Sequence, residues 1–138
     1  MLIRKMETKD IPEVISLIYE SVNSTCNKDY SPEQLEAWAP KRFNEKKFSD
    51  SLYGCFNRVM ISDGTISGFI SVCSDGYINR LYTHSKYQNM GIASRLLEEA
   101  EKWALSMGLD SFYLDASLTA RKFYINRGFK DNGESLLE

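Results

Sequence analysis

The stretch Gln88-Asn89-Met90-Gly91-Ile92-Ala93 decides the predicted fold, because it joins a polar turn to the start of a long helical pattern. The first N–H groups of a helix have no partner inside the helix, and the helix dipole adds partial positive charge there. Such a helix start can bind a phosphate or diphosphate group. Gly91 would let that group come close, since it carries no Cβ. A simple turn before a capped helix has the same pattern, so the flanking sequence must decide between the two.

A helix of about 16 residues follows this turn, with apolar residues at helical spacing and Gly108 as its stop signal. Its apolar positions are Ile92, Ala93, Leu96, Leu97, Ala100, Trp103, Ala104 and Met107. Three strands precede the turn, over residues 56–62, 66–74 and 77–83. Asp63-Gly64 and Asp75-Gly76 are hairpin signals between them. The centre of the chain is therefore predicted to be an antiparallel meander that leads into a helix.

The flanking segments complete a single mixed α/β domain over residues 1–138. We expect a strand over residues 2–6, a helix from about Ile11 and a second helix opened by Ser31-Pro32-Glu33-Gln34. One or two further helical turns are expected within residues 43–52. After the long helix we expect a strand at 112–116, a helix at 119–127 and a last strand from Phe129. The strand–helix–strand unit should be parallel and right-handed, with helices on both faces of the sheet.

Composition excludes several classes of protein. The formal charge is -2 and the sequence pI is near 5.5, so no global positive field points to nucleic acid. No apolar run is long enough to span a membrane, and the N-terminus lacks a signal peptide, so we expect a cytoplasmic protein. Three cysteines without a Cys-x-x-Cys pair and one histidine predict no metal site and no disulfide framework. Cys26, Cys55 and Cys73 are expected to be small buried side chains, and His84 a turn or capping residue.

Two sequence blocks, in this order, resemble the motifs of a known family. The first is Leu81-Tyr82-Thr83 followed by Gln88-x-x-Gly91-x-Ala93, and the second is Ala120-x-x-Phe123-Tyr124-x-x-x-Gly128-Phe129. They are similar to the diphosphate loop and the tyrosine-bearing helix of the GNAT superfamily of acetyl-CoA-dependent N-acetyltransferases. The resemblance covers roughly residues 2–129. Tyr30-Ser31-Pro32, Trp38-Ala39 and Asp115-Ala116-Ser117 resemble a branch of small bacterial members.

The resemblance implies a role for each matched residue. Acetyl-CoA would bind with its diphosphate on the loop residues Gln88, Asn89, Met90, Gly91, Ile92 and Ala93. Its pantetheine arm would extend the sheet along the main chain of Leu81, Tyr82 and Thr83, which also polarises the thioester carbonyl. Ser117, Ala120 and Phe123 would complete the acetyl-CoA site, with Ser117 where many members carry asparagine. Tyr124 would protonate the departing thiolate as general acid, after direct attack by an amine.

Several alternatives stay open on the sequence. Tyr124 is also compatible with a core tyrosine, and Ser94 and Arg95 with phosphate contacts or with a solvated helix surface. Glu33, Glu36, Asp75 and Asp115 lack a context that would mark one as the base, and Asn79 stands where relatives often carry an acid. A chain of water molecules could accept the proton of the amine in place of a side-chain base.

The acceptor amine, of a small molecule or a peptide, cannot be read from the sequence. An acyl-CoA-binding sensor or partner module without turnover is the alternative function, and a tRNA-acetylating toxin is disfavoured by the acidic balance. Nine residues follow Phe129, room for one strand where the family has two. We expect either a truncated C-terminus or a homodimer whose partner covers the sheet edge.

Overall fold

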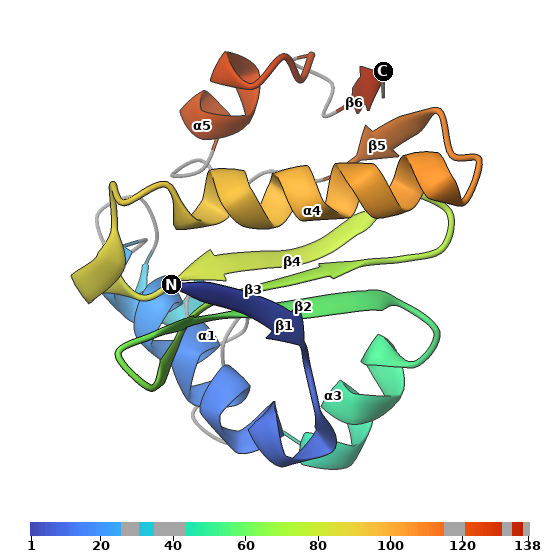
Figure 1. Ribbon diagram of the computed structural model, residues 1–138. Helices are drawn as coiled ribbons and strands as arrows, with labels where there is room; N and C mark the ends of the chain where they lie inside the picture. Colours follow the sequence, from blue (N-terminus) through green and yellow to red (C-terminus); the bar gives the residue numbers. More distant parts are fainter. Residues whose placement is uncertain (26–30, 35–43, 115–120, 131–133, 137–138) are drawn as a thin grey trace.

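A four-stranded antiparallel sheet in the order β1-β2-β3-β4 forms the centre of the protein, described from a computed structural model (Figure 1). The structure describes residues 1–25, 31–34, 44–114, 121–130 and 134–136. The sheet strands are β1 (Leu2–Lys5), β2 (Phe56–Ser62), β3 (Thr65–Val72) and β4 (Ile78–Thr83). The other described elements are η1 (Thr8–Asp10), α1 (Ile11–Thr25), α3 (Glu45–Leu52), η2 (Ser85–Tyr87), α4 (Ile92–Ser106), β5 (Ser111–Tyr113), α5 (Arg121–Asn126) and β6 (Glu134–Leu136).

The predicted meander is confirmed, including its first hairpin turn. Asp63 and Gly64 both have positive φ, 52° and 76°, as a two-residue turn between twisted strands requires. β2 pairs with β3, and β3 pairs with β4, each in antiparallel register. The register shifts by one residue between Ser71 and Val72, where β4 carries an irregularity before Arg80.

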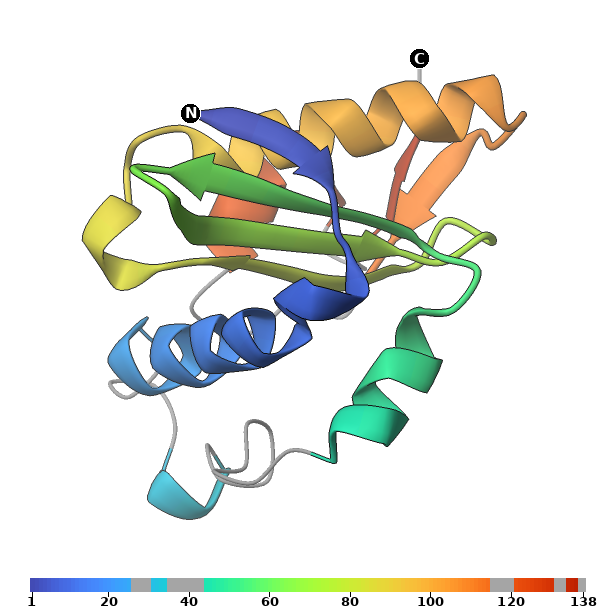
Figure 2. The ribbon, with the colours of Figure 1, turned by 60° about the horizontal axis from the view of Figure 1, so that its bottom comes forward.

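Two apolar layers hold the helices against this sheet. Helices α1 and α3 cover one face, and α4 covers the other (Figures 1 and 2). β3 is buried along seven of its eight residues because both faces are covered. Helix α4 comes so close to this strand that a Cβ on Gly68 would lie 2.5 Å from Cγ2 of Ile92. The sheet therefore fixes where α4 begins.

The C-terminal part departs from the sequence prediction. The strand expected at 112–116 is β5 (Ser111–Tyr113), with residues 115–116 outside the described part, and it pairs with β6 in a separate two-stranded sheet. The strand expected from Phe129 was placed wrongly, because the N–H of Phe129 donates to the carbonyl of Tyr124 and closes α5. The final strand is β6 instead. The helix expected at 119–127 is α5 (Arg121–Asn126), with Thr119 and Ala120 outside the described residues.

The second predicted helix falls largely outside the described residues, but its predicted start is present. The N–H of Ser31 donates to Oε1 of Gln34, and the N–H of Gln34 donates to Oγ of Ser31. This is the reciprocal capping box that the sequence predicts.

Two cysteines differ from the prediction. Cys55 and Cys73 are half-buried free thiols, and their sulfur atoms lie 3.7 Å apart where β2 begins and β3 ends. They lie together because Phe56 and Val72 are partners in the register, which makes the cysteines next to them neighbours across the strands. Burial is the largest cause, and the hydrogen bond with the Cys55 thiol the second, of a rise in the pKa of Cys73 to about 11. Cys26 lies outside the described residues.

No helix in the described ranges combines the length and the apolar character needed to cross a membrane.

Candidate functional site

The start of α4 has the geometry that the polar turn predicts. Gly91 is the N-cap residue in a left-handed conformation, φ 79°, and no side chain caps the helix. Within the described part of the chain, no hydrogen bond occupies the N–H groups of residues 91–94; the first one, from Arg95 N–H to the Gly91 carbonyl, lies one turn later. No atom of the described segments lies within 4 Å of a Cβ built on Gly91. The helix start is therefore an open site with free N–H donors.

The remaining residues of the turn shape this site in different ways. Asn89 also has positive φ, 62°, and Met90 is half exposed to solvent. Nε2 of Gln88 donates to the carbonyl of Thr83 at 3.2 Å, which ties the turn to the end of β4. The side chain of Ile92 is buried against the sheet, so only its main chain is available to a ligand.

The edge of β4 next to this turn carries unpaired main-chain groups. The N–H of His84 donates to the carbonyl of Ser67 at 2.8 Å, which fixes the alternation of the ladder. Tyr82 therefore points its main-chain groups to Phe69 on β3, whereas Leu81 and Thr83 point theirs away from β3. Among the described strands, none pairs with that edge beyond Tyr77. Leu81 and Thr83 are thus free to bond an extended ligand, apart from the Thr83 carbonyl held by Gln88.

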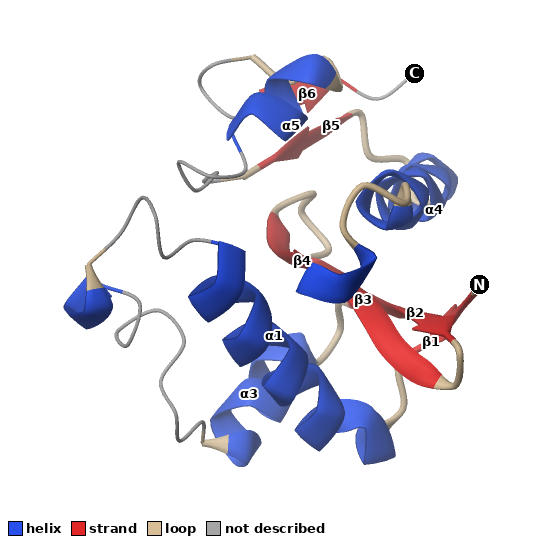
Figure 3. Ribbon diagram, turned by 90° about the vertical axis from the view of Figure 1, so that its left-hand side faces the viewer, coloured by secondary structure: helices blue, strands red, loops and turns tan. Residues whose placement is uncertain are grey.

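The parallel strands β4 and β5 meet at one point and then belong to different sheets. Tyr77 and Tyr113 form a single parallel bridge, with the N–H of Tyr113 donating to the Gly76 carbonyl at 3.1 Å. A Cβ on Gly76 would lie 2.5 Å from the Ser111 carbonyl oxygen, so this contact requires glycine. The hydroxyl of Tyr113 donates to Asp75, which also accepts the N–H of Tyr77. Figure 3 shows β5 and β6 set apart from the central sheet beside α4.

This arrangement bears on the carboxylates considered as base. Asp75 is occupied by Tyr113 at the point where the strands meet. Its hydrogen bond from Tyr113, followed by the one from Tyr77, lowers the pKa of Asp75. Glu33 is exposed on the segment 31–34, while Glu36 and Asp115 lie outside the described residues. Neither of the described candidates, Glu33 and Asp75, is positioned to act as the base. A chain of water molecules that takes the proton of the amine is therefore the simpler proposal.

Tyr124 lies on α5 inside the apolar layer of α4. It is 7% exposed, and its ring packs edge-on against Phe123 and Phe129, with ring centres 5.2 and 5.3 Å apart. Burial is the main cause, and the nearby Tyr82 phenol a smaller one, of a pKa of Tyr124 far above its ordinary value. Its hydroxyl therefore keeps its proton at neutral pH, as a proton donor must. Phe123 is half-buried against the same layer, and Ser117 and Ala120 lie outside the described residues.

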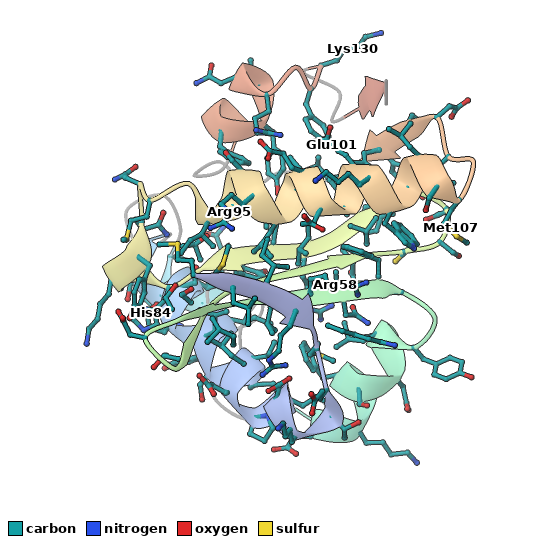
Figure 4. The ribbon with its side chains drawn as sticks, in the orientation of Figure 1. Arg58, His84, Arg95, Glu101, Met107 and Lys130 are labelled. Atoms are coloured by element: carbon teal, nitrogen blue, oxygen red, sulfur yellow. The ribbon has the colours of Figure 1, made fainter. Side chains whose placement is uncertain are left out.

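The sequence predicts only that His84 is a turn or capping residue. Nδ1 of His84 accepts the N–H of Lys86 and caps η2, as the capping interpretation predicts. Glu20 on α1 accepts hydrogen bonds from both the N–H and the hydroxyl of Ser85. Figure 4 shows His84 and Arg95 at the same end of the molecule, where β4 leads into α4. Arg95 is exposed in the first turn of α4, so its contact with phosphate stays a prediction.

Two residues near the site were missed by sequence reasoning. Glu20 looks like an ordinary polar position of an amphipathic helix, and Arg80 like the polar half of a strand. Only the packing of α1 and α3 on the sheet reveals them. The guanidinium of Arg80 lies 4.8 Å from the centre of the Phe48 ring, and burial lowers the pKa of Arg80. Strand alternation could have placed Arg80 on the α1 side, but not shown what it touches.

Comparison with known proteins agrees with this geometry. A family model described as an acetyltransferase (GNAT) domain matches residues 26–138. The chain is 30% identical over 128 residues to YafP, an uncharacterized N-acetyltransferase of Escherichia coli strain K12, covering 93% of this chain and 80% of that protein. It is 27% identical over 144 residues to the spermidine N(1)-acetyltransferase of Thermoplasma acidophilum, covering 93% and 87%.

Solved structures show the same fold. A GCN5-related N-acetyltransferase from Rhodopseudomonas palustris superposes with a TM-score of 0.88 at 30% identity, covering 93% of this chain and 80% of that one. The PaiA N-acetyltransferase of Thermoplasma acidophilum, in complex with coenzyme A, gives 0.80 at 28% identity, covering 94% and 89%. The predicted mixed α/β architecture is therefore confirmed.

Proposed function

The chain belongs to the GNAT acetyltransferases and is an acyltransferase, and from this premise we propose that it moves the acetyl group of acetyl-CoA to an amine. One observation carries the proposal: open N–H donors at the start of α4 lie directly after the unpaired edge of β4. A ligand that joins a diphosphate to an amide-bearing arm fits both features, with the diphosphate at the start of α4 and the arm along the edge of β4. Family membership supports the enzyme over a binding module without turnover.

The diphosphate would accept hydrogen bonds from the N–H groups of residues 91–94, where the helix dipole adds favourable charge. Gly91 leaves room for the phosphate oxygens, and Gln88 holds the turn in place through the Thr83 carbonyl. The pantetheine arm would pair with the main chain of Leu81 and Thr83, as an added strand does. Ser117, Ala120 and Phe123 remain part of this proposed site by resemblance.

The chemistry would proceed by direct attack. The amine nitrogen forms a bond to the thioester carbon while the main chain near Leu81 stabilises the negative charge on the carbonyl oxygen. The carbon–sulfur bond then breaks, and the sulfur takes the proton of the Tyr124 hydroxyl. The proton lost by the amine passes to water, and water reprotonates Tyr124. The raised pKa of Tyr124 keeps the donor protonated before each turnover.

The experiment is a thiol-release assay with acetyl-CoA and a panel of amines. The panel contains amino acids, their carboxamides, short peptides with free N-termini, aminoalkyl phosphates and spermidine. Thiol released in proportion to an acetylated amine, confirmed by mass spectrometry, is the expected result. Acetyl-CoA that binds without any amine being acetylated would contradict the proposed function.

A further inference from the structure

We propose that Arg80 binds an anionic group of the acceptor, so that the substrate is an amine that carries a carboxylate or phosphate. This inference rests on the proposed acetyl transfer and adds the class of the acceptor. Arg80 lies on β4 directly before Leu81, whose main chain faces the open edge that the proposed acetyl-CoA site uses.

Arg80 differs from Arg4 and Arg127 in what surrounds its charge, and from Arg95 in that Arg95 is exposed to solvent. Arg4 pairs with Asp10, and Arg127 pairs with Glu101. In the part of the chain that the structure describes, no carboxylate and no hydrogen-bond acceptor contacts the Arg80 guanidinium, although it is half-buried over the Phe48 ring. A cation removed from water without a counter-ion is costly, and an anion supplied by a ligand would offset that cost.

Arg58 provides an internal comparison. Its guanidinium also lies over an aromatic ring, 4.2 Å from the centre of Phe56, and burial also lowers its pKa. However, Nη1 of Arg58 donates to the carbonyl of Asn57 at 3.0 Å, and Glu99 attracts its charge. The ionisable groups that act on the Arg80 charge are the thiols of Cys55 and Cys73 and the phenols of Tyr77 and Tyr82, and none of these four is a carboxylate. Stacking on a ring therefore does not explain why Arg80 lacks an acceptor.

The residue opposite Arg80 on β3 is also polar, and its hydroxyl lacks a hydrogen-bond partner among the described residues. Ser71 is the register partner of Arg80, so the two side chains lie on the same face of the sheet. The hydroxyl oxygen of Ser71 is fully buried and has no hydrogen-bond partner among the described residues. A buried hydroxyl without a partner is uncommon and indicates a missing water or ligand group. A guanidinium and a hydroxyl on one face can bind an oxyanion together.

This face of β4 continues to Tyr82, whereas the proposed acid, Tyr124, packs in the α4 layer on the other side of the sheet. Tyr82 follows Arg80 on the same face, about 6.6 Å along the strand, and its phenol is near enough to raise the pKa of Tyr124. An acceptor whose amine reaches the thioester near Tyr82 and Tyr124 could therefore place an adjacent anionic group at Arg80. Planar guanidinium groups bind carboxylates and phosphates through two parallel hydrogen bonds. A polycation such as spermidine would be repelled there.

The experiment compares acceptor pairs that differ only in the anion. Each amino acid is assayed against its carboxamide, and phosphoethanolamine against ethanolamine, which separates carboxylate from phosphate. We expect the wild type to favour the anionic member of at least one pair by about 10- to 100-fold in kcat/KM. Arg80→Met should reduce that ratio to near one, because the KM of the anionic acceptor rises. The KM of acetyl-CoA should be unchanged. Arg80→Lys should retain part of the preference.

The matched control is Arg58→Met, which should leave the preference intact. The inference is wrong if the wild type acetylates the neutral member or spermidine equally well, or if Arg80→Met keeps the preference. Those results leave acetyl transfer itself standing. If no amine of either kind releases thiol from bound acetyl-CoA, the proposed function fails and this inference fails with it. Loss of folding by Arg80→Met is detected by its melting temperature, and Arg80→Lys then carries the comparison.

Discussion

Glu20 and Ser85, 65 residues apart in the sequence, are joined by two hydrogen bonds that fix the first helix to the segment before the diphosphate turn. The carboxylate of Glu20 accepts the N–H of Ser85 at 3.1 Å and also its hydroxyl. Burial alone would raise the pKa of Glu20, but these bonds, with one from Ser24, lower it. Glu20 therefore stays ionised at any pH where the enzyme would work, and it holds η2 in place ahead of Gln88 and Gly91.

Replacing Glu20 tests this link between α1 and the turn. Glu20→Gln should raise the KM of acetyl-CoA about fivefold while kcat changes little, because the turn loses a hydrogen bond to a charged acceptor. The control is Glu13→Gln on the same helix. Glu13 accepts the N–H of Ile66 at 2.7 Å, away from the turn, so its loss should lower stability without affecting acetyl-CoA. An equal effect of both variants on KM would remove the proposed role of Glu20.

Gly91 and Gly64 give a matched pair for the diphosphate site. Both have positive φ, 79° and 76°, and both have open space where a Cβ would be. Alanine at either position should therefore cost about 1 kcal/mol of folding free energy. Only Gly91→Ala should also raise the KM of acetyl-CoA, by about tenfold, because it alone lies at the start of α4. If Gly64→Ala raised KM as much, the effect would come from stability and not from the ligand.

Tyr124 is predicted to act in the chemical step. Tyr124→Phe keeps the ring and its packing but removes the proton donor, so kcat should fall about 100-fold. The affinity for acetyl-CoA, measured by calorimetry, should be nearly unchanged. Tyr53→Phe, at a tyrosine that is 91% exposed and has no role in the proposed mechanism, serves as control. A Tyr124→Phe enzyme with the wild-type rate would remove the hydroxyl from the mechanism and leave it a core residue.

The ion pair at the start of α1 should make stability depend on acid pH. Arg4 donates from both Nη atoms to buried Asp10, at 2.8 and 2.9 Å, and the N–H of Glu7 donates to it at 2.7 Å. The bond from Arg4 is the largest cause, and together with the Glu7 bond it outweighs burial and lowers the pKa of Asp10 below 3.8. The stabilisation is therefore complete above the unfolded pKa and is lost as the pH falls through the folded pKa.

Chemical denaturation between pH 7 and pH 2 checks this account. Asp10→Asn should lose about 2 kcal/mol at pH 7 and show a flatter fall of stability below pH 4. Lys102→Met removes an exposed pair with Glu99 and should change stability little at any pH. Parallel pH profiles for wild type and Asp10→Asn would contradict the assignment.

The sequence predicted most of the central fold because its signals there are local. Asp63-Gly64 specifies a hairpin through positive φ at both residues, and the apolar spacing from Ile92 specifies α4. The polar turn before Ile92 was located on the same grounds. These features depend on neighbouring residues and need no knowledge of tertiary contacts.

Other features depend on contacts that the sequence does not contain. The final strand was placed at Phe129 because an apolar residue after Gly128 looks like a strand start, yet Phe129 caps α5 through Tyr124. Glu20 and Arg80 acquire their significance only when α1 and α3 pack on the sheet. Cys55 and Cys73 became neighbours through strand register, which hairpin signals constrain without fixing.

The central claim is that the N–H groups at the start of α4 bind the diphosphate of acetyl-CoA. Amide chemical shifts of ¹⁵N-labelled protein, titrated with coenzyme A and separately with pantetheine, test it most directly. We predict that coenzyme A shifts the amides of residues 91–94 strongly and that pantetheine, which lacks the diphosphate, leaves them near their free positions. Saturable binding of coenzyme A with those amides unmoved would contradict the claim.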